Sequence, residues 1–115
     1  MNNNIKLNKI EINNIINIIF ILSSILSIYG NKLIKESIYY NDLSKKQQAD
    51  KIFIKITFIS ILIYIYFLKE NYNAYKKKNE NKYKIRLLGS TLVLIGTILI
   101  FYFQINSSFD NPTDI

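Results

Sequence analysis

The middle of the chain carries an apolar run, KIFIKITFISILIYIYFLK, with a lysine at each end. Between Lys51 and Lys69, only Lys55 is charged. As an α-helix, residues 52–68 would extend about 26 Å, slightly less than the roughly 30 Å hydrocarbon thickness of a bilayer. This run predicts a membrane-spanning helix and constrains the rest of the chain more than any other feature.

A β-strand is the competing interpretation, because isoleucines recur at every second position from Ile52 to Ile56 and from Ile59 to Ile65. Strands rarely exceed about 10 residues, and this run is apolar on both faces. Its Ile, Leu and Phe residues contribute roughly −4 to −7 kcal/mol towards membrane insertion. Lys55 opposes insertion by about 3 kcal/mol at most, and near the end of the run its side chain can reach the headgroups. The helix is therefore favoured.

Two similar apolar runs flank the central one. We predict an all-α fold: an integral membrane protein with three transmembrane helices, the second extended into the cytoplasm. The expected segments are a cytoplasmic tail (1–11), a first span (12–30), an extracytoplasmic loop (31–50), a second span (51–69), a basic cytoplasmic loop (70–84), a third span (85–105) and an extracytoplasmic tail (106–115).

Composition excludes several kinds of chemistry. The 115 residues include no Cys and no His, which removes disulfide frameworks, Cys/His metal sites, thiol nucleophiles and imidazole acid–base catalysis. Half of the residues are hydrophobic, and they concentrate in the three runs, so no separate soluble domain is expected. Abundant Ile, Asn and Lys with a single Arg is typical of an AT-rich genome such as that of a low-GC bacterium.

Local signals predict where the helices end. Gly30-Asn31 is a typical helix stop, followed by Lys32 where a cation suits a helix C-terminus. Residues 32–40 are then either a short helix on the membrane surface or a polar loop. Ser44 to Gln47 matches a capping box, which predicts that the second helix begins near Lys45. Tyr64, Leu68, Tyr72 and Tyr75 recur at intervals of four, four and three residues, which predicts that the helix continues to about Lys78.

Polar and small side chains form a stripe on each predicted span, and such stripes usually mark helix contacts in membranes. Asn13 and Ser27 extend the stripe of the first span, and Thr57 and Tyr64 extend that of the second, leaving Ile54, Ile61 and Ile65 for lipid. A pore lining is the open alternative for the first span. The predicted helix-packing residues are Asn17, Ser24, Ser60, Gly89, Ser90, Gly96 and Thr97.

The most basic stretch of the chain lies between the second and third spans. Clusters of this kind gain about 1 kcal/mol per cation beside an anionic leaflet, and they also act as topology signals. A loop held between two spans has no fold with which to read nucleic-acid bases, so nucleic acid is not expected as a partner. The predicted surface for anionic lipid headgroups consists of Lys76, Lys77, Lys78, Lys82, Lys84 and Arg86.

The distribution of cations predicts the orientation. Nine cations fall on the side of the N-terminus and the second loop, and five fall on the side of the first loop. By the positive-inside rule, the N-terminus is cytoplasmic and the C-terminus lies outside, in a multi-pass protein of the cell membrane.

The residues offer no catalytic constellation, no phosphate-binding Gly loop and no cofactor site, so an enzyme is not expected. We expect a non-enzymatic accessory or assembly partner that meets copies of itself or a larger membrane protein. The alternative is a pore former of the phage-holin kind. Three-span holins typically place a strongly charged tail in the cytoplasm, whereas this tail is short, acidic and predicted outside. A small multidrug-type exporter is disfavoured, because the spans lack an embedded Glu and a fourth span is absent.

Overall fold

The computed structural model describes residues 2–107 and places them in three α-helices. They are α1 (Asn2–Tyr40), α2 (Leu43–Lys78) and α3 (Asn81–Ser107). The prediction of an all-α fold with three long apolar helices is confirmed, and by length and composition each helix could cross a membrane. Most of the predicted C-terminal tail, residues 108–115, lies outside the described residues.

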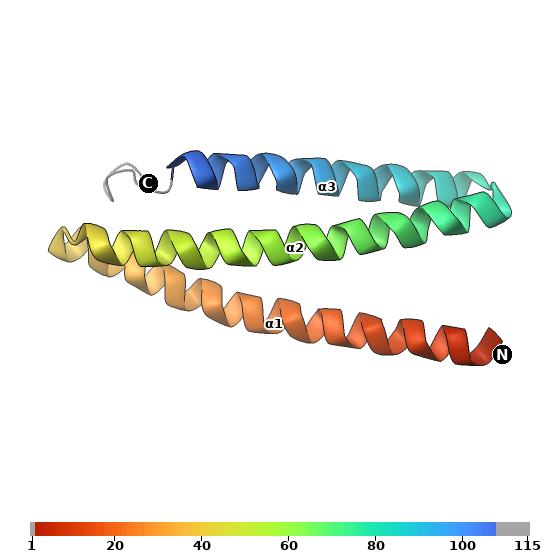
Figure 1. Cartoon of the computed structure of the whole chain (residues 1–115), viewed down its shortest axis with the longest axis horizontal. Helices are drawn as coiled ribbons and strands as arrows, with labels where there is room; N and C mark the ends of the chain where they lie inside the picture. Colours follow the sequence, from red (N-terminus) through yellow and green to blue (C-terminus); the bar gives the residue numbers. More distant parts are fainter. Residues whose placement is uncertain (1, 108–115) are drawn as a thin grey trace.

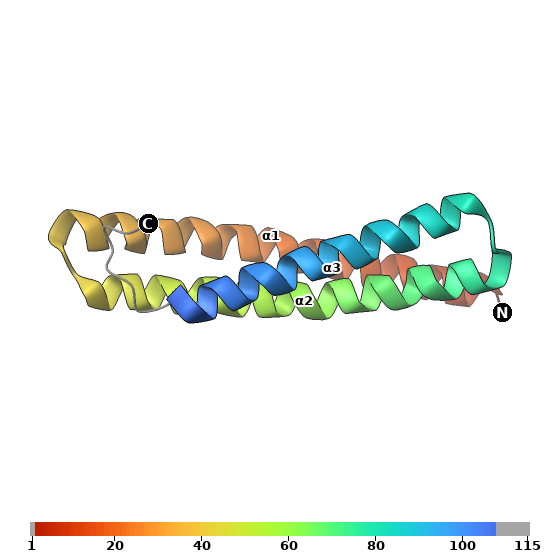
Figure 2. The same ribbon diagram turned by 90° about the horizontal axis from the view of Figure 1, so that it is seen from above.

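The central helix α2 organises the fold, because α1 and α3 both pack against it (Figure 1). Successive helices run antiparallel, giving an elongated molecule of 57 × 24 × 16 Å. α3 crosses α2 at an angle, and α1 lies close to α2 near Tyr40 but diverges from it towards the N-terminus (Figures 1 and 2). The turn around Asn41 closes one end of the molecule, here called the Asn41 end, and the turn around Asn79 closes the other, the Asn79 end.

The predicted helix stop at Gly30 is wrong. α1 continues through Gly30 and Asn31 to Tyr40, and Gly30 does not adopt a positive φ. The glycine serves close packing instead: a Cβ built on it would lie 2.8 Å from Cζ of Phe53 on α2. Residues 32–40 are therefore the last turns of α1, not a loop or a separate surface helix.

The predicted start of the second helix is also corrected. α2 begins at Leu43, and its N-cap is Asp42, whose Oδ1 accepts the Ser44 backbone N–H at 3.0 Å. The N-cap therefore lies two residues before Ser44, the N-cap expected from the capping-box pattern, because the Asp42 side chain satisfies an exposed backbone N–H. The backbone N–H of Asp42 in turn donates to the Ser37 carbonyl at 2.9 Å, which ties the turn to α1.

A residue with a left-handed backbone conformation follows the last residue of both α1 and α2. Asn41 follows α1 with φ 52°, and Asn79 follows α2 with φ 42°; asparagine adopts this conformation more readily than most residues. The Asn79 N–H donates to the Tyr75 carbonyl at 2.7 Å. The connection between α2 and α3 is thus two residues long, and α2 extends to Lys78 as predicted.

Very little of the apolar surface is covered by the chain itself. Within the described residues the buried apolar side chains are Ile16, Leu33, Ala49 and Ile63, whereas large aliphatic and aromatic side chains remain exposed along all three helices. A water-soluble domain of this size would bury most of them, because burial of apolar surface is its main source of stability.

Candidate functional site

Ion pairs between helices lie at the two ends of the molecule. At the Asn79 end, Lys9 Nζ of α1 lies 3.1 Å from Glu70 Oε2 of α2. At the Asn41 end, Lys45 Nζ of α2 lies 2.5 Å from Glu36 Oε2 of α1. The α2 residues of these pairs are 25 positions apart, about 37 Å along a helix. No ion pair of residues 2–107 involves the stretch between Lys51 and Lys69.

The Glu36 and Lys45 pair shifts both pKa values towards the charged forms. The hydrogen bond from Lys45 is the main cause that lowers the pKa of the Glu36 carboxyl, and it outweighs partial desolvation. The same bond raises the pKa of the Lys45 ammonium. Both groups are therefore charged throughout the neutral range.

A more deeply buried cation lies at the Asn41 end between α2 and α3. Lys46 is only 4% exposed, and its Nζ donates to Asp50 Oδ2 at 2.6 Å and to the Ser107 carbonyl at 3.4 Å. The last carbonyls of a helix carry partial negative charge, so this position suits a cation. Nearby on α3, Gln104 Oε1 is buried without a hydrogen bond from the described residues.

Hydroxyl groups in the apolar parts of the helices bond to their own backbone. Ser24 donates to the Phe20 carbonyl at 2.9 Å, and Ser60 donates to the Ile56 carbonyl at 3.0 Å. Thr97 donates in the same way to the carbonyl four residues before it, at 2.8 Å. These groups are satisfied without a neighbouring helix or water, so their presence alone does not indicate a pore or a partner.

The predicted packing residues occupy different surroundings. A Cβ at Gly89 or Gly96 would meet nothing within 4 Å, so neither glycine supports a contact between helices of this chain. Asn17 is exposed on α1. Ser90 does lie between helices: its Oγ accepts a hydrogen bond from Asn71 Nδ2 of α2. A role of these residues in contacts with another molecule stays a prediction.

The predicted polar stripe of α2 is partly turned towards its neighbours. Ser60 is half-buried, and the Tyr64 ring lies 6.2 Å from the Phe20 ring of α1. Ile65 is exposed as expected for a lipid-facing residue, whereas Ile54 and Ile61 are half-buried.

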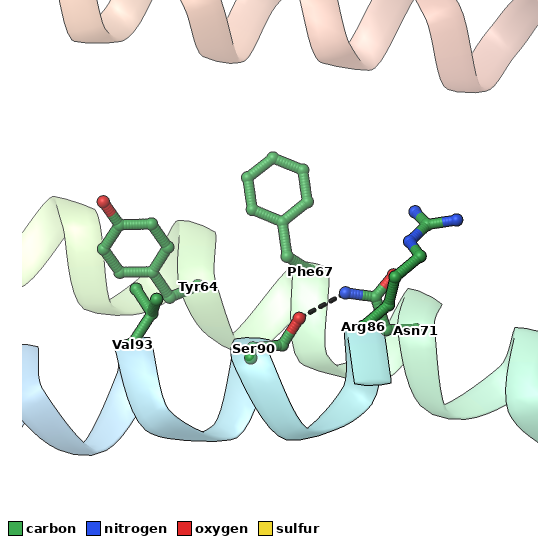
Figure 3. Close-up of a pocket in the computed structure, with 7 residues that line it drawn as sticks. Tyr64, Phe67, Asn71, Arg86, Ser90 and Val93 are labelled. Carbon is green, nitrogen blue, oxygen red and sulfur yellow. Dashed lines mark hydrogen bonds between the residues drawn. The ribbon is translucent and has the colours of Figure 1, made fainter. Parts of the chain in front are cut away.

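A groove runs along α2 at the Asn79 end (Figure 3). One part has a volume of about 310 Å³, and a neighbouring part of about 260 Å³ reaches α1. Phe67, Asn71 and Arg86 line both parts. The other residues that we include in this groove are Lys9 and Asn13 of α1, Tyr64, Tyr66, Glu70 and Ala74 of α2, and Gly89, Ser90 and Val93 of α3.

The predicted anionic-lipid surface divides into two parts. Lys76, Lys77 and Lys78 form the last turn of α2, and Lys82 and Lys84 are exposed in the first turn of α3. Arg86 is also exposed, but it lines the groove. Lys9, Glu70 and Asn71 also line the groove, and the sequence analysis did not identify them. The available signal was that Lys9 and Glu70 lie just outside two apolar runs, because antiparallel helices can bring such charged residues together.

The chain matches no protein-family profile, no curated protein and no solved structure. Within residues 2–107, no group of three or more His, Cys, Asp and Glu side chains gathers in a way that could hold a metal ion. The arrangement of charge, polar groups and exposed apolar surface is therefore the basis for a functional proposal.

Proposed function

We propose that this protein is a three-span integral membrane protein that acts without chemistry of its own, as an accessory or assembly partner of other membrane components. One observation carries the proposal. The ion pairs between helices lie at two ends about 37 Å apart along α2, and large exposed apolar side chains occupy the surface between them. This spacing matches a hydrocarbon layer with a headgroup region on each side.

The short connections support the same arrangement. With only two residues between consecutive helices, the three apolar stretches must lie side by side, so that their charged ends fall at common levels. Backbone polar groups inside the helices are paired along the helix, as a lipid environment requires. The excess of cations at the Asn79 end favours a cytoplasmic N-terminus.

The hydroxyl groups of the apolar stretches give the pore-forming alternative no specific support, because Ser24, Ser60 and Thr97 donate to carbonyls of their own helices. Dye leakage from cells after induced expression would support the pore former, and retention of the dye would support the accessory role.

Cysteine labelling tests the insertion, because the natural chain contains no Cys. Tyr39 at the Asn41 end is 80% exposed in the isolated chain, and Leu99 in the apolar stretch of α3 is 64% exposed. We expect a membrane-impermeant maleimide to label Tyr39→Cys and not Leu99→Cys, since lipid covers residue 99 and suppresses the thiolate. Equal labelling of the two variants in native membranes would refute the insertion.

A third variant tests the orientation. Lys77→Cys lies at the opposite end from Tyr39→Cys, and both positions are exposed. In intact cells, the reagent should reach Tyr39→Cys alone, and it should reach Lys77→Cys after permeabilisation. The reverse order would contradict a cytoplasmic N-terminus.

A further inference from the structure

The groove at the Asn79 end contains an arginine without a partner in the described part of the chain. Arg86 is the single arginine of the sequence. Within residues 2–107, its guanidinium has neither an ion pair nor a hydrogen bond. The other cation of the groove, Lys9, is paired with Glu70 at 3.1 Å. The three charged groups therefore leave a net charge of +1 that centres on Arg86.

The walls of the groove change from polar to apolar along α3. Arg86 lies at one end, next to Asn71 and Ser90, and Val93 lies about 10 Å further along the helix, beside Tyr64 (Figure 3). Gly89 leaves this wall open, because a Cβ there would meet nothing within 4 Å. The site thus combines a cation with five donors at its mouth and an apolar surface towards the middle of the span.

We propose that this groove binds one anionic phospholipid, with its phosphate at Arg86 and the first part of an acyl chain against Phe67 and Val93. An arginine fork matches phosphate oxygens bidentately, unlike the point charge of lysine. The amide of Asn13 lines the same space from α1. This inference rests on the proposed membrane insertion and replaces part of the diffuse basic surface with a specific site.

Two alternative occupants fit less well. A free phosphate ion would use Arg86 but leave the apolar wall beside Val93 uncovered. A second copy of this chain docked through the same face would bring two Arg86 side chains together, and like charges across a two-fold interface are unfavourable. A phospholipid satisfies both the charge and the apolar wall.

Native mass spectrometry tests the proposal on the full chain reconstituted with equal amounts of phosphatidylglycerol and phosphatidylcholine, then transferred to detergent. We expect one phosphatidylglycerol to remain bound to the wild-type monomer. Arg86→Lys keeps the charge but loses the fork, and should lower the retained fraction about fivefold or more, as for loss of a charge-assisted hydrogen bond. Lys84→Gln, which removes a cation outside the groove, should retain lipid like the wild type.

The two outward glycines of α3 provide a matched steric pair. A Cβ has open space at both Gly89 and Gly96, but only Gly89 lines the groove. Gly89→Leu should displace the lipid, whereas Gly96→Leu should not. Neither substitution meets another part of the chain at its Cβ, and a circular dichroism spectrum of Gly89→Leu that matches the wild type would show that loss of lipid does not reflect misfolding.

Several results would overturn the inference. One is that Arg86→Lys retains as much phosphatidylglycerol as the wild type, and another is that Arg86→Lys and Lys84→Gln lower lipid retention equally. Release of the lipid by excess inorganic phosphate, or a dimer without bound lipid, would also contradict the proposal. If no lipid is retained while Leu99→Cys stays protected from labelling in membranes, the groove proposal fails and the insertion stands. If Leu99→Cys is labelled, both fail.

Discussion

Substitution of Gly30 by alanine tests the close packing of α1 on α2. The added Cβ would lie 2.8 Å from Cζ and 3.1 Å from Cε2 of Phe53, whereas carbon atoms prefer a separation of about 3.5–4.0 Å. Either the ring or the helix must therefore move by roughly 0.7 Å. Overpacking of this kind costs about 1–3 kcal/mol.

A second effect acts in the opposite direction. Gly30 has an ordinary helical conformation without positive φ, so alanine gains about 0.8–1 kcal/mol of helix propensity at this position. Gly96→Ala provides the matched control, because it has the same propensity gain and open space around its Cβ. We expect Gly96→Ala to be slightly stabilised and Gly30→Ala to be less stable than Gly96→Ala by the overpacking cost, about 1–3 kcal/mol.

The assay is reversible unfolding in mixed detergent micelles as the fraction of sodium dodecyl sulfate rises, followed by circular dichroism. The variant Gly30→Ala/Phe53→Leu supplies a double-mutant cycle, because a smaller side chain on α2 relieves the clash. We expect the double variant to be more stable than the sum of the single effects predicts, by about 1 kcal/mol or more. Equal stabilities of Gly30→Ala and Gly96→Ala would refute the close packing.

Two further predictions concern the charged groups at the Asn41 end. Lys46→Met leaves Asp50, whose side chain is only 15% exposed, without its partner and should destabilise the protein by roughly 3 kcal/mol. Lys46→Met/Asp50→Leu should recover most of this loss in the same assay, and no recovery would contradict an ion-pair origin. The pKa of Glu36 is lowered in the folded protein. Its pair with Lys45 therefore stabilises the fold at pH values above about 4.3, the pKa of Glu in the unfolded chain. This stabilisation is lost as the pH falls through the lower pKa of the folded state. A carboxyl NMR titration should give a lower midpoint for Glu36 in the wild type than in Lys45→Gln, and equal midpoints would disprove the shift.

The helices themselves were predictable because their signals are long. Three apolar stretches bounded by charges allow few alternatives to helices, and the tyrosines that follow Leu68 at helical spacing indicated the extension of α2 to Lys78. These signals act within one segment and do not depend on how segments pack.

The errors occurred where a local signal had two possible meanings. Gly30 suits a helix stop as well as a close helix contact, and only the position of Phe53 decides between them. Asp42 and Ser44 are both good N-cap residues, and the bond from the Asp42 N–H to Ser37 selects the first. Local sequence alone does not contain that contact.

The groove could not be predicted because it depends on the register of three helices. Asn71 meets Ser90 and Lys9 meets Glu70, and a shift of one helix by a single residue would change the direction of each side chain by about 100°. The sequence predicted a polar stripe on α1 and a small-residue stripe on α3, and Asn13 and Gly89 from these stripes line the two parts of the groove.

The lengths of the apolar stretches explain why the groove opens at this end. Residues 12–31, between Glu11 and Lys32, would extend about 30 Å as a helix, whereas residues 52–68 of α2 extend about 26 Å. On the proposed insertion both cross the same layer, so the longer stretch of α1 is expected to tilt further from the membrane normal than that of α2. α1 is fixed to α2 near Tyr40 by the short turn, and the inclination therefore moves its N-terminal half away from α2 (Figure 1). The space that opens lies beside Lys9 and Asn13, where the polar end of the groove is found.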